Sequence, residues 1–89
     1  MSMQERIAAR LQTALDPTGL AVIDDSGKHA GHAGARPGGE THYSVGIVSA
    51  AFAGKSRVQR HRLVYDALAA EIADGVHALA VRARAPGEP

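Results

Sequence analysis

Four of the five histidines occupy positions from which an imidazole could bind a metal ion. His29 and His32 lie in a glycine-rich segment, whereas His42 and His77 each begin a predicted strand. The chain has no cysteine, so its own metal ligands are limited to His, Asp and Glu. Two imidazoles cannot complete a structural zinc site, which takes four ligands, but they suit one iron of a [2Fe–2S] cluster. A loop histidine and a histidine at a strand start, His42 or His77, are therefore candidate donors to a site that another molecule completes.

These histidines also have simpler interpretations. His77 could be a partly buried imidazole that bonds to the backbone, and His29 and His32 could be no more than polar loop residues. The fifth histidine, His61, lies on the expected apolar stripe of a helix, which favours a structural role.

A run of basic residues is the second feature that could bind a partner. It covers residues 55–62, at the start of the longest predicted helix. Cations there face the positive end of the helix dipole, which is mildly unfavourable and so favours an anionic partner, either nucleic acid or protein. The alternative is a solvated helix face without a partner. The candidate nucleic-acid contacts are Lys55, Arg57, Arg60 and Arg62.

Three observations argue against strong binding of nucleic acid by this run. The chain has 10 Lys and Arg against 9 Asp and Glu, a net charge of only +1. Aromatic residues make up 3% of the chain, and none lies in the basic run to stack on bases. A KH module clamps the nucleic-acid backbone with a GXXG loop, but Arg57 occupies the place of the second glycine.

Motifs of catalysis are not recognisable in the sequence. Gly54-Lys55-Ser56 resembles the end of a phosphate-binding P-loop, but Ser49 occupies the place of its first glycine. No Ser-His-acid order or nucleophile elbow stands out, and 89 residues leave little room for a deep pocket. We therefore expect a protein that acts by binding, not an enzyme, and no small-molecule substrate.

The length of the chain allows one domain, which we assign to residues 1–89. No apolar run approaches the roughly 20 residues that are needed to span a bilayer. Residues 1–6 lack the apolar core of a signal peptide. We expect a cytoplasmic protein that does not contact a membrane.

Periodicity predicts two helices, over residues 3–15 and about 57–73. Each begins with the pattern of a capping box, formed by Ser2 with Glu5 and by Ser56 with Gln59. Gly75 is expected to end the second helix. The apolar stripe of that helix is expected to contain Val58, His61, Val64, Tyr65, Leu68 and Ile72.

Short apolar or alternating segments predict strands at 20–24, 42–49 and 77–84. Five glycines and a proline make residues 25–41 a long flexible loop between the first two strands, which we expect to pair as an antiparallel hairpin. Residues 86–89 form a short tail. The predicted helices therefore cover one face of a small mixed sheet.

Four segments together resemble the signature of the BolA family. They are GGETHYSV at 38–45, IVS at 47–49, FAGKSRVQRHRLVY at 52–65 and GVHALA at 75–80. The similarity extends over nearly the whole chain, and its most specific parts surround His61 and His77. The resemblance implies an α/β (α+β) fold of the class II KH-like type, ordered α-β-β-α-α-β, with a short helical turn near residues 50–54. It also implies a three-stranded mixed sheet with helices on one face.

The resemblance further implies a partner and a cofactor. BolA-like proteins bind monothiol glutaredoxins, and the pair can share a [2Fe–2S] cluster that glutathione also ligates. The family's ligands are a His or Cys in the loop between the first two strands and a His at the start of the last strand. By resemblance these ligands are His77 and His29, with His32 as a near rival, and the isolated chain is expected to hold no cofactor.

BolA-like proteins are also described as transcriptional regulators. The resemblance therefore implies DNA as a second partner, bound through the basic helix at residues 55–62. Binding of a cluster and binding of DNA need not exclude each other.

Overall fold

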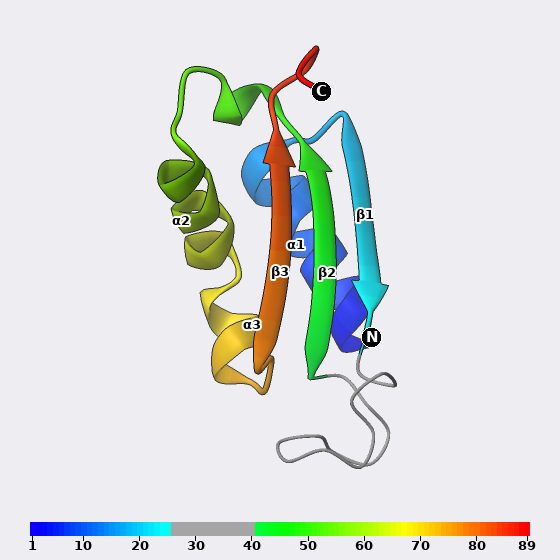
Figure 1. The fold of residues 1–89 in the computed structure, drawn as a ribbon. Helices are drawn as coiled ribbons and strands as arrows, with labels where there is room; N and C mark the ends of the chain where they lie inside the picture. The colour runs from blue at the N-terminus through cyan, green and yellow to red at the C-terminus, as the bar shows by residue number, and fades with distance from the viewer. Residues whose placement is uncertain (26–40) are drawn as a thin grey trace.

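The computed structural model describes residues 1–25 and 41–89, so His29, His32 and most of the predicted loop lie outside the described residues. Figure 1 shows a three-stranded sheet with its helices on one face, which confirms the predicted fold class. The elements are α1 (Met3–Leu15), β1 (Gly19–Asp24), β2 (His42–Val48), a 3-10 helix η2 (Ala50–Phe52), α2 (Arg57–Ala67), α3 (Ala69–Ala73) and β3 (Ala78–Arg84).

The sheet has β2 at its centre, with the strand order β1-β2-β3. β1 and β2 pair antiparallel, from Gly19 opposite Val48 to Asp24 opposite Tyr43, which confirms the predicted hairpin. β2 and β3 pair parallel, and α2 and α3 make the crossover that a parallel pair requires. The parallel pairing therefore places the starts of β2 and β3 at the same end of the sheet (Figure 1).

The core lies between the helices and one face of the sheet. Along β2, Tyr43, Val45 and Ile47 are buried, while the residues between them are only partly covered. This is the alternation expected when only one face of a strand packs against helices. The core also contains residues from α1, η2, α2 and the turns near β3, namely Met3, Ile7, Leu11, Phe52, Val64, Leu68, Val76 and Ala85.

Both predicted capping boxes are present. The Ser2 side chain accepts a hydrogen bond from the Glu5 N–H, and the Ser56 side chain accepts one from the Gln59 N–H. In each case the Glu5 or Gln59 side chain accepts a hydrogen bond from the backbone N–H of the serine. Gly75 follows α3 with φ of 133°, a left-handed value that glycine adopts without strain, as expected for the residue after a helix.

None of the helices in residues 1–25 and 41–89 is long and apolar enough to cross a membrane.

The expectation of one continuous helix over 57–73 is wrong, because Leu68 has φ of −100° and ψ of 16° and separates α2 from α3. The expected apolar stripe is also wrong in part: Val58 is 65% exposed, and Tyr65 and Ile72 are more than a third exposed. The buried face is instead formed by Val64, Leu68 and Glu71.

Glu71 explains why hydrophobicity alone missed this face. Its side chain is 1% exposed, and its carboxylate lies 3.1 Å from Arg6 Nη2 and 3.5 Å from Arg10 Nε, both on α1. The guanidinium of Arg6 also bonds Asp74 at 2.8 Å. A charged residue can occupy a buried position when opposite charges are held against it. The network joins α1 to the end of α3, directly before the turn that leads to β3.

Candidate functional site

His77 lies immediately before β3, because the strand begins at Ala78, one residue later than predicted. Its backbone N–H donates to the Thr41 carbonyl at 2.8 Å, and the next N–H, from Ala78, donates to the same oxygen at 3.2 Å. Thr41 is fully buried, and on the other side of His77 the buried Val76 donates its N–H to the carbonyl of Glu71. The backbone of His77 is therefore fixed on both sides, while its side chain is exposed.

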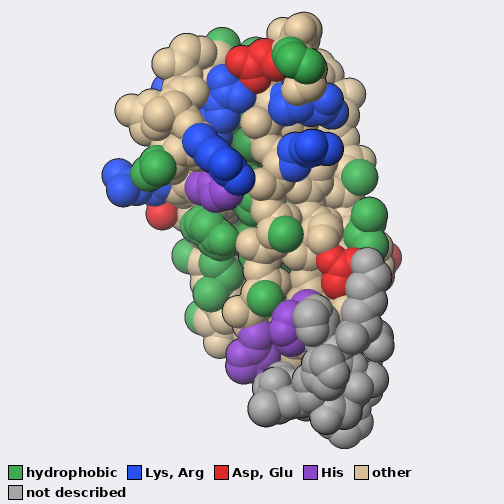
Figure 2. Space-filling model, in the orientation of Figure 1, with side chains coloured by type: hydrophobic (Ala, Val, Ile, Leu, Met, Phe, Trp, Pro, Cys, Tyr) green, Lys and Arg blue, Asp and Glu red, His purple; other side chains and the backbone are tan. Residues whose placement is uncertain are grey.

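His42 lies beside His77 because β2 and β3 are parallel and in register. The register pairs His42 with Ala78, and the Nδ1 of His42 lies 2.8 Å from the Thr41 hydroxyl. Figure 2 shows histidine side chains gathered at this end of the sheet, and another on the side where α2 lies. The sequence marked His42 as a strand start but gave no reason to group it with His77, since the pairing of the strands was not known.

The segment that carries His29 and His32 connects to the described chain at this same end. It follows Asp25 and precedes Thr41, and the Asp25 N–H donates to the His42 carbonyl at 2.8 Å. The Ser44 hydroxyl also donates to the Asp25 carboxylate. The predicted pairing of His29 or His32 with His77 thus involves one position that the structure describes and two that lie outside it.

The side chain of Tyr65 links α2 to the first residues of β3. Its hydroxyl donates to the Leu79 carbonyl at 3.0 Å, two residues after His77. Its ring meets the ring of His61 edge to face, with centroids 6.3 Å apart. His61 is partly buried.

The donors at this end suit a shared metal site. Imidazole is the only strong nitrogen donor for iron that the chain offers, and His77 presents one on a fixed backbone. Within residues 1–25 and 41–89, no three His, Asp or Glu side chains are grouped as metal ligands. A metal centre here would therefore need further donors from outside the described residues.

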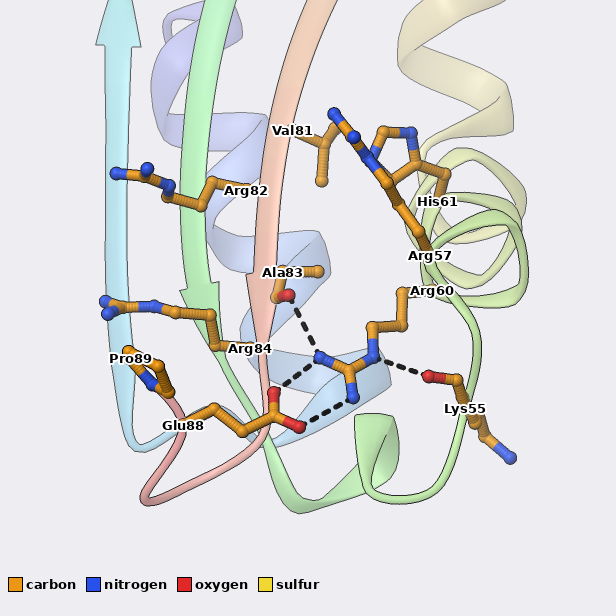
Figure 3. A pocket seen from close by; sticks show the side chains of 10 residues that line it. All are labelled: Lys55, Arg57, Arg60, His61, Val81, Arg82, Ala83, Arg84, Glu88 and Pro89. Carbon is orange, nitrogen blue, oxygen red and sulfur yellow. Dashed lines mark hydrogen bonds and ion pairs between the residues drawn. The ribbon is translucent and has the colours of Figure 1, made fainter.

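A basic groove lies at the opposite end of β3. It has a volume of about 670 Å³ and is bordered by α2, β3 and the C-terminal turn (Figure 3). Arg82 and Arg84 project from the sheet face that no helix covers, opposite Gly46 and Val48 of β2. The charged residues that line the groove are Lys55, Arg57, Arg60, Arg82, Arg84 and Glu88.

The four basic residues predicted from the sequence do not share one surface. Arg57 lines the groove, and Lys55 contributes to it while its ammonium points away from Glu88 (Figure 3). Arg62 instead lines two shallow hollows elsewhere on α2. Arg82 and Arg84 were missed, although two arginines at i and i+2 of an alternating strand share one face. Only the parallel pairing and the crossover show that this face adjoins α2.

Arg60 is held within the chain by Glu88. Its Nη1 and Nη2 lie 2.5 and 2.9 Å from the two carboxylate oxygens of Glu88, a bidentate pair. Its Nε donates to the Lys55 carbonyl at 3.0 Å, and Nη1 is also 3.3 Å from the Ala83 carbonyl. Arg60 therefore ties the C-terminal turn to α2 and to the end of β3.

The Arg60–Glu88 pair should make stability depend on pH in the acid range. The hydrogen bond from Arg60, and then the N–H of Ala85, lower the pKa of Glu88 from 4.5 to about 2. The ion pair contributes its full stabilisation above pH 4.5, where Glu88 is ionised in the folded and the unfolded chain. This stabilisation is lost as the pH falls towards 2, because the carboxylate of Glu88 becomes protonated in the folded state as well. We expect Glu88→Gln to lower the free energy of unfolding at pH 6 and to have no effect near pH 2, as measured by urea denaturation. A difference that stays constant with pH would contradict this account.

Several known proteins are similar to this chain in sequence and in fold. A family model described as BolA-like protein matches residues 11–88. The chain is 51% identical over 87 residues to SufE-like protein 1, chloroplastic/mitochondrial, of Arabidopsis thaliana, in a match that covers 93% of this chain and 24% of that protein. It is 41% identical over 81 residues to the DNA-binding transcriptional regulator BolA of Escherichia coli (strain K12), with 91% and 73% covered. The BolA domain of SufE1 from Arabidopsis thaliana superposes with a TM-score of 0.89 at 48% identity, over 100% of this chain and 98% of that one.

Proposed function

The chain belongs to the BolA family, and on that premise we propose that it is a binding partner of monothiol glutaredoxins. In the heterodimer, the two proteins and glutathione share a [2Fe–2S] cluster, which is the cargo of the complex. His77 provides one imidazole, and His29 provides the second, with His32 as the rival. The role is cluster trafficking or iron regulation by binding, without catalysis.

The observation that supports this proposal most is the setting of His77. Its imidazole is exposed, and its backbone is held by the Thr41 carbonyl at the end of the sheet where the segment with His29 begins and ends. Fixing a ligand before binding reduces the entropy that is lost on forming a metal site. A chain without cysteine can bind iron of a cluster through imidazole nitrogen, as Rieske centres do.

The proposal is tested by mixing the chain with a cluster-loaded monothiol glutaredoxin in the presence of glutathione. We expect one heterodimer on sizing, together with a visible circular dichroism spectrum that differs from that of the glutaredoxin alone. Apo-glutaredoxin is the matched control, because it shows how much of the association depends on the cluster. Two separate elution peaks and an unchanged spectrum would contradict the proposal.

A second function, binding of duplex DNA, is favoured by the basic groove. Arg57, Arg82 and Arg84 line it from α2 and β3 (Figure 3), and the Escherichia coli relative is named as a DNA-binding regulator. The groove and His77 lie at opposite ends of β3, which is about 20 Å long at ~3.3 Å per residue. The two sites can therefore be occupied at the same time.

The salt dependence of DNA affinity distinguishes binding in the groove from binding on the helix face that the sequence predicted. The slope of log affinity against log salt changes by about 0.9 for each phosphate contact. We expect Arg82→Ala/Arg84→Ala to weaken duplex binding and to make the slope shallower by roughly 1.8, for two lost contacts. Arg62→Ala is the control, since Arg62 lies outside the groove. A loss in Arg62→Ala without a loss in Arg82→Ala/Arg84→Ala would assign the interface to the helix face, and no loss in either would remove support for DNA binding.

A further inference from the structure

The C-terminal turn places a carboxylate inside the basic groove. Glu88 is the only acidic side chain among the described residues that line the groove. Figure 3 shows its carboxylate facing the guanidinium of Arg60, between the end of β3 and the start of α2. The turn itself is secured mainly by Glu88, which accepts the Ala85 N–H at 2.7 Å and donates its own N–H to the Ala85 carbonyl at 3.2 Å.

The Arg60–Glu88 contact has the geometry with which arginine binds a phosphate. Two guanidinium nitrogens face two oxygens of one planar anionic group, and a phosphodiester offers an equivalent pair of oxygens. The Arg60 side chain is 14% exposed and that of Glu88 is 40% exposed. Glu88 thus covers Arg60 while remaining accessible to solvent and displaceable.

The other cations of the groove differ from Arg60 in having no such cover. Among the residues that the structure describes, Arg57, Arg82 and Arg84 have no carboxylate partner within 4.0 Å, and neither does Lys55. Their charge attracts an anion to the groove, but the guanidinium of Arg60, whose side chain is only 14% exposed, is already occupied by Glu88. An incoming phosphate must therefore exchange with Glu88 to reach Arg60.

We propose that Glu88 is a built-in competitor for the phosphate site at Arg60, and that the backbone of duplex DNA displaces it. This inference rests on the DNA-binding function proposed above and adds its regulation. In the free protein Arg60 bonds Glu88, whereas in the complex it bonds a phosphate and the C-terminal turn is released. The arrangement weakens binding to any duplex by the cost of breaking one bidentate pair.

The test compares Glu88→Gln with a matched control, Asp74→Asn. Both changes remove one negative charge and one carboxylate bonded to an arginine, but Asp74 bonds Arg6 at the end of α3, away from the groove. Glutamine at 88 can still accept the Ala85 N–H. By fluorescence anisotropy with a labelled 20-base-pair duplex, we expect Glu88→Gln to bind roughly three- to tenfold more tightly than the wild type. The slope of log affinity against log salt should become steeper by about 0.9, for one more phosphate contact. We expect Asp74→Asn to stay within about twofold of the wild type, because salt screens distant exposed charges.

A double-mutant cycle with Arg60→Gln isolates the exchange. If Glu88 competes for Arg60, Glu88→Gln should have no more effect than the control once Arg60 is absent. Glu88→Ala provides a second variant if the glutamine protein does not fold. An unchanged affinity, or an equal gain with and without Arg60, would overturn the competitor role. The DNA-binding function would still stand if Arg82→Ala/Arg84→Ala weakened binding, whereas no binding by any protein of the set would overturn both.

Discussion

Replacement of His77 by alanine is expected to abolish the spectrum of the histidine-ligated cluster in the glutaredoxin complex while leaving the fold intact. The imidazole is exposed, so its removal should change the free energy of unfolding by less than about 0.5 kcal/mol. The ligand cannot be replaced by a neighbour along the strand, since the residues after it are Ala78, Leu79 and Ala80. Visible circular dichroism of the reconstituted complex and urea denaturation of the free chain measure the two effects.

Two further variants complete this prediction. His61→Ala removes an imidazole from α2, away from the starts of β2 and β3, and should leave the cluster spectrum unchanged. His29→Ala/His32→Ala removes both candidate loop ligands together and should abolish the spectrum as His77→Ala does. If His77→Ala and the loop double variant both give wild-type spectra, these histidines are not ligands and the chain docks on glutaredoxin without binding the cluster.

Replacement of Phe52 by alanine is expected to have the largest effect on stability. Phe52 is fully buried, although it lies in the short helix η2 between β2 and α2. Truncating a buried phenylalanine typically costs about 3–5 kcal/mol, and small domains have only roughly 5–15 kcal/mol of stability in total. Urea denaturation should show a large loss of the free energy of unfolding or a chain that no longer folds. Val58→Ala, at a 65% exposed position, is the control and should cost less than about 1 kcal/mol.

A loss of less than about 1 kcal/mol on Phe52→Ala would contradict the placement of η2 over the core. The backbone carbonyl of Phe52 also accepts the Lys55 N–H at 3.1 Å, so Phe52 lies in the turn that leads to the basic run.

Local rules were enough to predict most of the elements. The serine and the Glu or Gln three residues later specify both helix starts by bonds within one turn. The alternation of Tyr43, Val45 and Ile47 specifies which face of β2 is buried. These features depend on residues close together in the chain, and the sequence shows them directly.

Most features that the sequence did not predict depend on contacts between distant segments. The burial of Glu71 depends on its contacts with Arg6 and Arg10 of α1, which lie more than 60 residues earlier in the chain. The parallel pairing of β2 with β3 places His42 at the same end of the sheet as His77. The crossover between these strands brings Arg57 to the groove that Arg82 also lines. The contact of Arg60 with Glu88, 28 residues later in the chain, was not predicted from the sequence either.

Imidazole ligation of the shared cluster is tested most directly by pulsed electron paramagnetic resonance of the reduced heterodimer. This chain would carry histidine labelled with ¹⁵N, while the glutaredoxin and glutathione remain unlabelled. We predict strongly coupled nitrogen with the ¹⁵N signature, which His77→Ala removes in whole or in part. A cluster without coupled nitrogen, or with coupled nitrogen that remains ¹⁴N, would contradict the assignment of this chain as the source of the histidine ligands.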